Sequence, residues 1–132
     1  MNTIPGTIVK VDSSENISLV DVDVGGDILT CVIIDTERTA SYLRIGNDVK
    51  LVIKETEVAL AKNLAGIVSI RNKMNGSVID IEHGDILTKV RIRYKSALVT
   101  SVITTRSARA LELKPGDAVT ALVKSNEVSI MR

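Results

Sequence analysis

Short runs of β-branched and aliphatic residues dominate the chain and predict strands. In the first half, these runs cover residues 7–11, 18–24, 28–34 and 48–53. Residues 20–24, VDVDV, alternate between apolar and polar positions, which is typical of a strand with one buried face. Gly25-Gly26-Asp27 separates two runs and indicates a hairpin turn. The spacing then changes, and residues 39–44 predict one short helix that ends before Gly46.

The second half of the chain repeats this order of elements. Strands are predicted over residues 66–70, 86–94, 98–104 and 117–123. A short helix is predicted over 106–111, followed by a turn at 114–117. An additional run at 77–81 precedes the second hairpin and has no counterpart in this reading of the first half.

Comparison of the two halves indicates an internal repeat. Residues 43–46 align with 113–116, and 52–54 with 122–124, both at an offset of 70. Residues 6–9 align with 66–69 at an offset of 60, so we expect about ten extra residues in a longer first hairpin of the second copy, at 72–85. The pentapeptide GDILT occurs at 26–30 and 84–88 and is treated as a coincidence, because it breaks the better alignment. The predicted domains are residues 1–60 and 61–132.

These elements predict an all-β protein. Four or five short strands with one late short helix are typical of an OB-like Greek-key barrel, so we expect two such barrels, each with one short helix. The predicted linker, residues 59–63, contains no proline or glycine and is very short. The two barrels are therefore expected to touch.

Composition narrows the range of functions. The net charge is +1, and Tyr42 and Tyr94 are the only aromatic residues, which argues against nucleic-acid binding by these modules. We see no signal peptide, and no apolar run approaches the length of a membrane span. A single cysteine, Cys31, fits a reducing cytoplasm and is read as a buried apolar residue. His83 is the only histidine and is expected in an exposed turn, so neither a metal centre nor an enzyme is predicted.

Hydroxyl and lysine side chains gather at the ends of predicted elements. Residues 102–107, VITTRS, run from a strand into a helix start, where hydroxyls and free N–H groups suit a small anion. Lys124-Ser125 follows the last predicted strand, and Lys54-Glu55 occupies the same place in the first copy. A lysine at a strand end is commonly only solubilising, but its recurrence in both copies favours a function.

Several segments occur in a fixed order along the chain: 2–8 (NTIPGTI), 100–107 (TSVITTRS), 111–117 (LELKPGD) and the two closing segments 53–58 (IKETEV) and 123–128 (VKSNEV). They resemble the Mop (molybdenum-pterin-binding protein) family, also called the TOBE or molbindin domain. A repeat of that family opens Ser-Ala-Arg-Asn-x-Leu-x-Gly-x-Val and continues Thr-Ser-Ser-Ile-Thr-x-x-Ser, then Leu-x-Leu-x-x-Gly-Asp. It closes with Ile-Lys-Ala-Ser-Glu-Val. The resemblance covers nearly the whole chain as two consecutive copies.

The resemblance implies an OB-like protein that binds molybdate or tungstate, without an organic cofactor, between subunits of a dimer or trimer. Such proteins store the anion, sense it in transcription regulators, or regulate importer ATPases. The residues that match the family's anion-binding positions are Thr104, Ser107, Lys124 and Ser125, with Lys54 and Asn2 from the first copy and Lys62 as a substitute for the opening arginine.

The sequence also departs from the family pattern. Met1 stands where the opening motif has arginine, and the first copy has Ile34-Asp35-Thr36-Glu37 where threonine and serine are expected. Two carboxylates there would repel an anion, so we expect the second copy to supply most of the ligands. The alternative is a TOBE-type module that only mediates assembly in a transporter ATPase or transcription regulator.

Overall fold

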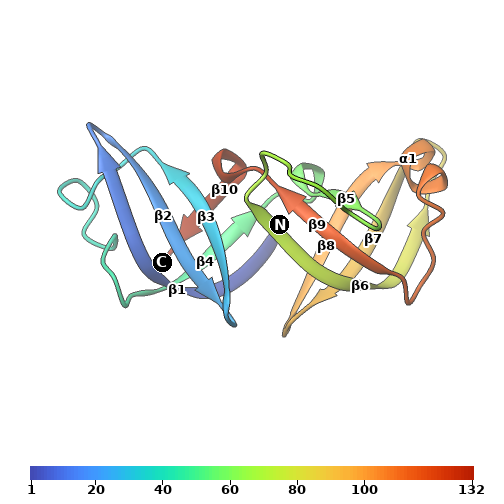
Figure 1. The fold of residues 1–132 in the computed structure, drawn as a ribbon, viewed down its shortest axis with the longest axis horizontal. Helices are drawn as coiled ribbons and strands as arrows, with labels where there is room; N and C mark the ends of the chain where they lie inside the picture. Colours follow the sequence, from blue (N-terminus) through green and yellow to red (C-terminus); the bar gives the residue numbers. More distant parts are fainter.

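The computed structural model describes all residues, 1–132, and forms two five-stranded sheets, each curled into a barrel (Figure 1). The first half contains β1 (Asn2–Ser14), β2 (Ile17–Val24), β3 (Asp27–Ile33), β4 (Asp48–Ile53), the 3-10 helix η1 (Glu55–Glu57) and β5 (Ala59–Ala61). The second half contains β6 (Asn72–His83), β7 (Leu87–Tyr94), β8 (Ala97–Thr104), α1 (Thr105–Ala110), β9 (Ala118–Val123), η2 (Ser125–Glu127) and β10 (Val128–Met131). The predicted all-β, OB-like class is confirmed.

The two halves exchange their last strands. The first sheet has the order β10-β4-β1-β2-β3, and the second has the order β5-β9-β6-β7-β8. Val128 of β10 pairs with Ile53 of β4, and Ala59 of β5 pairs with Leu122 of β9. Figure 1 shows β10, in red, among the blue and cyan strands of the first half. The division at residue 60 therefore remains a prediction about sequence units, because each sheet contains strands from both sides of it.

The strand register corrects the predicted repeat. Asn2 pairs with Ile53, and Asn72 pairs with Val123, so both halves follow one offset of 70 residues. The predicted ten-residue insertion is wrong, because residues 72–83 form the single strand β6.

The predicted strand over 66–70 is also wrong. Gly66 has a φ of +84° and Ile67 is fully exposed, so this run of apolar residues lies in the connecting loop rather than in a sheet. The predicted linker is displaced as well, since its first residues form β5 and the loop that follows connects the halves.

A glycine in the first strand of each half lets two strands approach closely. A Cβ atom on Gly6 would lie 2.5 Å from Val22 Cγ1, and one on Gly76 would lie 2.8 Å from Ile92 Cγ2. Two residues further along each strand, a β-bulge shifts the register between Ile8 and Lys10 and at the equivalent place in β6. Glycine and bulge together bend the long first strand so that the barrel can close.

Gly76→Ala is expected to lower the free energy of unfolding by about 1–3 kcal/mol, because the new methyl group overlaps the Ile92 side chain and the Arg93 carbonyl. Urea denaturation followed by circular dichroism measures the change. Ser77→Ala, at the exposed neighbouring position, is the control and should stay within about 0.5 kcal/mol of the parent. Equal stability of the two variants would contradict the close approach.

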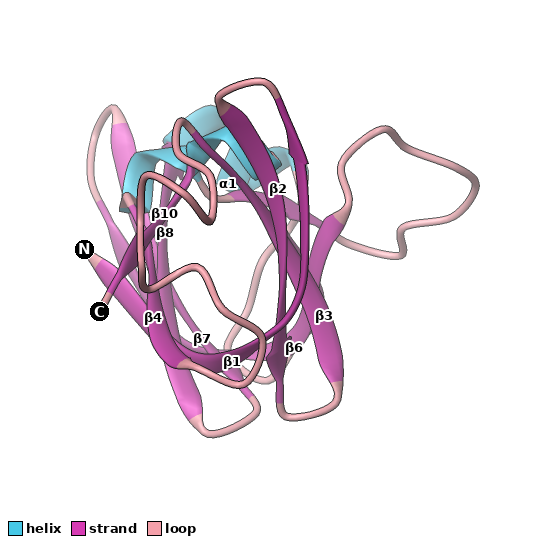
Figure 2. Cartoon of the chain, turned by 90° about the vertical axis from the view of Figure 1, so that its left-hand side faces the viewer, coloured by secondary structure: helices cyan, strands magenta, loops and turns pink.

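Only the second half contains an α-helix, so the helix predicted over 39–44 is wrong. Residues 35–47 form turns instead, and Figure 2 shows this loop leading into β4 across the end that faces the viewer. The sequence explains the difference: α1, TRSARA, is rich in alanine and arginine, which favour helix. In the first half, the short polar side chains of Asp35, Thr36 and Thr39 bond to backbone or to each other and compete with helix formation.

The cores of the two halves form one contiguous apolar cluster, as the predicted contact between the barrels requires. Polar bonds also cross between the halves. The Tyr94 hydroxyl donates to Asp27 Oδ2 at 2.7 Å, and Ser101 Oγ donates to the Val58 carbonyl at 2.6 Å. None of the helices is long and apolar enough to cross a bilayer.

Candidate anion-binding site

Apart from Lys62, the predicted site residues lie in two separate clusters, one at each of the short 3-10 helices. The cluster at the start of η2, here called the η2 end, contains Lys124 and Ser125. The cluster at the start of η1, here called the η1 end, contains Lys54 and Asn2, and Thr104 and Ser107 line a hollow of about 420 Å³ with η1. Each end combines residues of both halves, so the predicted set does not converge on one point within a chain.

A buried asparagine anchors each end. At the η2 end, Asn72 is fully buried; its Oδ1 accepts from the Thr30 N–H at 2.7 Å and its Nδ2 donates to the Thr30 carbonyl at 2.8 Å. At the η1 end, Asn2 makes the same two bonds to the Thr100 backbone, at 2.8 and 2.7 Å. Thr30 and Thr100 lie on β3 and β8, each of which forms one edge of its sheet. Each side-chain amide thus pairs the free backbone N–H and carbonyl of an edge strand in the opposite half.

The η2 end has two bonded hydroxyls and, at neighbouring backbone positions, two cations without a carboxylate partner. Ser125 Oγ lies 2.6 Å from Thr30 Oγ1, which itself lies 3.4 Å from Asn72 Oδ1. Lys124 is exposed, and its ammonium has neither a hydrogen-bond nor an ion-pair partner. Because Asn72 pairs with Val123, the next residues outward, Arg71 and Lys124, come to the same end of this ladder.

Arg71, Asn72 and Thr30 are not among the predicted site residues, although the sequence carries a signal for the first two. Residues 69–78, SIRNKMNGSV, follow the family's opening pattern with Ser69, Arg71, Asn72 and Gly76 in place. The alignment at offset 60 hid them by assigning the opening to residues 60–64. Arg71 is exposed and unpaired, so its guanidinium is free for a ligand.

The η1 end differs because Glu55 occupies the position of Ser125. The Glu55 carboxylate accepts from the Met1 ammonium at 2.9 Å, and that bond lowers the Glu55 pKa, with its own backbone bond and then Lys89 adding to the effect. Thr104 caps α1, its Oγ1 accepting from the Ser107 N–H at 3.1 Å and donating to Ser107 Oγ at 2.8 Å. Both hydroxyls are exposed but already bonded to each other.

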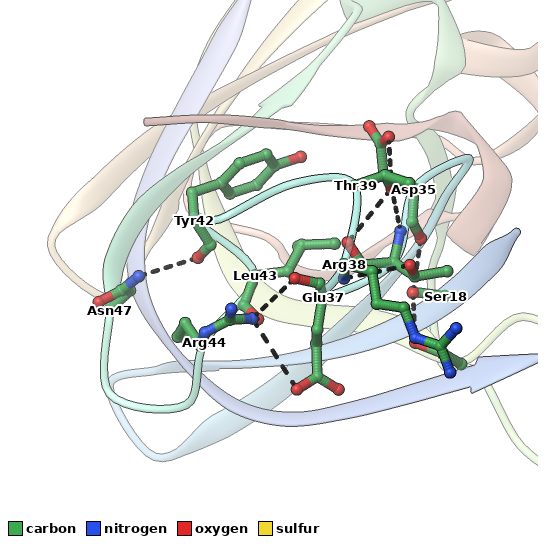
Figure 3. Close-up of polar contacts among 11 residues, drawn as sticks. Ser18, Asp35, Glu37, Arg38, Thr39, Tyr42, Leu43, Arg44 and Asn47 are labelled. Atoms are coloured by element: carbon green, nitrogen blue, oxygen red, sulfur yellow. Dashed lines mark hydrogen bonds and ion pairs between the residues drawn. The ribbon is translucent and has the colours of Figure 1, made fainter.

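The first-half counterpart of the capping segment uses its carboxylates internally (Figure 3). Asp35 Oδ1 accepts from Thr39 Oγ1 at 3.0 Å, while Arg44 lies 4.0 Å from the Glu37 carboxylate and donates to the Glu37 carbonyl at 3.0 Å. Ser18 Oγ, from β2, donates to the Asp35 carbonyl at 2.6 Å. This loop offers no capping hydroxyl equivalent to Thr104, because Ile34 stands at that position.

Lys62 serves the second barrel rather than an open site. Its Nζ donates to the Leu111 and Glu112 carbonyls, both at 3.1 Å, and lies 3.1 Å from Asp117 Oδ2. The Asp117 pKa is lowered first by the Lys114 backbone N–H and then by Lys62. All three donors of the ammonium are therefore occupied beyond the end of α1.

Lys62→Ala is expected to lower the free energy of unfolding by about 1 kcal/mol and to leave anion affinity unchanged, because the ammonium bonds to the protein alone. Thermal unfolding and a molybdate titration measure the two quantities. A loss of anion affinity without a loss of stability would show that Lys62 takes part in anion binding.

The remaining reactive groups lie outside both ends. Cys31 is buried, as predicted, and burial raises the pKa of its thiol to about 12. Burial, followed by the bond to Asp27, raises the pKa of Tyr94. His83 is exposed at the end of β6, and no group of three or more His, Cys, Asp or Glu residues is placed to hold a metal.

Fold and site define a tandem of OB-like barrels with exchanged strands and two pseudo-equivalent polar ends. The profile of the TOBE domain matches residues 1–60 and 68–130. The chain belongs to the TOBE domain family.

Relatives of this chain carry molybdenum-related names. MopB, a molybdenum-pterin-binding protein of Rhodobacter capsulatus, is 36% identical over 109 residues, covering 78% of this chain and 39% of MopB. The molybdenum transport protein ModE of Azotobacter vinelandii is 37% identical over 87 residues, 65% of this chain and 32% of ModE. The chain thus spans less than half the length of either.

A solved structure matches almost the whole fold. The cytoplasmic molybdate-binding protein ModG, with molybdate bound, superposes with a TM-score of 0.90 at 28% identity, covering 98% of this chain and 94% of ModG. The two chains therefore share their tandem arrangement as well as the single barrel.

Proposed function

We propose that this chain binds molybdate or a closely similar tetrahedral oxyanion, and so takes part in molybdenum homeostasis. The observation that carries the proposal is the η2 end, where Arg71 and Lys124 share one end of a ladder without an ion-pair partner. Like charges held near each other without a counter-ion are unfavourable. A bound dianion removes that repulsion, and the relatives and ModG supply its identity.

The neighbouring groups suit an oxyanion rather than a metal cation. Lys124 and Arg71 supply positive charge, and when Thr30 Oγ1 donates to Ser125 Oγ, the Ser125 proton is available for an anion oxygen. A partly desolvated dianion needs both charge compensation and several donors. Exchange of such a ligand requires no catalytic residue, and tungstate has the same charge and shape.

We infer further that the chain forms a homo-oligomer that completes the site. Small barrels leave apolar surface uncovered, and here the same three positions are exposed in both halves: Val9 and Ile79, Ile17 and Leu87, Ile28 and Leu98. A contact between copies would cover them and shield an anion at the ends from water. A dimer or trimer in the cytoplasm is the assembly we propose.

Isothermal titration calorimetry of the purified chain with molybdate tests the function, with nitrate as the monovalent control. We expect saturable binding of molybdate and of tungstate, at least about tenfold tighter than nitrate because the charge is doubled. Light scattering with and without molybdate measures the oligomer.

The alternative function is an assembly module without anion binding. Glu55 and Glu37 favour it, because these carboxylates stand where the family pattern has alanine and serine. A stable oligomer that releases no saturable heat with any tetrahedral dianion would establish this alternative and reject the proposed function.

A further inference from the structure

The pseudo-symmetry of the chain allows the η1 and η2 ends to be compared residue by residue. Asn2 matches Asn72, Thr100 matches Thr30 and Lys54 matches Lys124, and the amide bonds agree within 0.1 Å. The backbone frames of the two ends are therefore equivalent. Differences in binding must come from the side chains that break this symmetry.

Three positions break the symmetry most strongly. Met1 stands where the η2 end has Arg71, and its ammonium is bonded to Glu55 at 2.9 Å, so it is not free for an anion. Glu55 replaces Ser125, so a carboxylate stands where the other end has a hydroxyl bonded to Thr30. Without that partner, the Thr100 hydroxyl makes no hydrogen bond at the η1 end. On β7, Lys89 replaces Leu19 of β2 and acts electrostatically on Glu55. The charge of Lys89 is thus directed partly to a carboxylate instead of remaining free for an anion.

We propose that the two ends form unequal oxyanion sites, a tight one at the η2 end and a weak one at the η1 end, and that Glu55 sets the difference. The inference rests on the proposed function. A single negative charge about 4 Å from a dianion weakens binding by about tenfold or more even at the dielectric constant of water. The chain is therefore expected to fill its sites in order, over two ranges of molybdate concentration.

Swapping the two residues tests the proposal with sodium molybdate as the probe. In calorimetric titrations, wild type should show a tight and a weak class of site. Glu55→Ser should tighten the weak class at least about tenfold, and Ser125→Glu should weaken the tight class at least about tenfold. The double variant, Glu55→Ser with Ser125→Glu, should again show a tight and a weak class, with the tight class now at the η1 end. Adding Lys54→Ala to this double variant should therefore weaken the tight class.

Control variants distinguish an effect of the Glu55 charge on molybdate affinity from an effect of misfolding. Glu15→Asn removes the same charge at the exposed β1–β2 turn, where φ is +59°, and should leave both classes unchanged. If Ser125→Glu fails to fold, Lys54→Ala in the wild-type background remains decisive, because it should weaken only the weak class. Equal classes in wild type, or a Glu55→Ser variant with wild-type affinities, would overturn the proposal. The absence of any molybdate binding by wild type would instead reject the proposed function.

Discussion

Asn72→Ala is expected to lower the free energy of unfolding by about 2–4 kcal/mol. The substitution leaves the Thr30 N–H and carbonyl without partners on the buried side of β3. Each unpaired buried backbone group costs about 1–3 kcal/mol, partly offset where water enters. The same change also loosens Thr30 and Ser125, so molybdate affinity should fall together with stability.

Urea denaturation at fixed chain concentration measures this effect, since an oligomer's stability depends on concentration. Asn75→Ala is the matched control, because Asn75 is an exposed asparagine on the same strand with one bond, to Thr120 Oγ1. Its cost should stay below about 1 kcal/mol. If both variants lose the same small amount, the amide of Asn72 does not hold the halves together.

Lys124→Ala is expected to weaken the tightest molybdate binding at least about tenfold while changing stability by less than about 0.5 kcal/mol. The ammonium is exposed and unpaired in the free chain, so its removal breaks no bond within the protein. Its charge acts on the anion alone, and a unit charge next to a dianion accounts for an effect of that size.

Calorimetry measures this second effect, and Lys73→Ala supplies the control. Lys73 is an exposed, unpaired lysine on β6, close in sequence to the η2 end but on the strand itself. The Lys73→Ala variant tests whether the loss of any nearby positive charge weakens molybdate binding as much as the loss of Lys124. Equal affinities for the two variants would show that binding is non-specific electrostatic attraction and not a site built on Lys124.

Hairpins and barrel class could be predicted from sequence because their signals are local. The alternation at 20–24 and the Gly25-Gly26 turn determine β2, β3 and their connection without reference to the rest of the chain. The register of the repeat was predicted wrongly because the exposed run 66–70 resembles a strand in composition. This run differs from a true strand only in its structure: Gly66 has a positive φ, and no other strand pairs with the run.

The site was predicted only in part, for a physical reason. Residues such as Lys124 and Ser125 carry their chemistry in their own side chains and could be found by motif. Thr30 lies at the η2 end because Asn72, from the other half, binds its backbone. The exchange of β5 and β10 between the two sheets determines which residues lie together at each end. This exchange could not be predicted, because the alternation of apolar and polar residues within a short terminal strand does not specify the sheet that it joins.

Anomalous diffraction at the molybdenum absorption edge, from crystals grown with molybdate, is the most direct measurement of where the anion binds. We expect the strongest peak beside Lys124, Arg71 and Ser125, and a weaker one beside Lys54. No peak at the η2 end, or peaks only at positions remote from both 3-10 helices, would contradict the central claim that these polar ends hold the oxyanion.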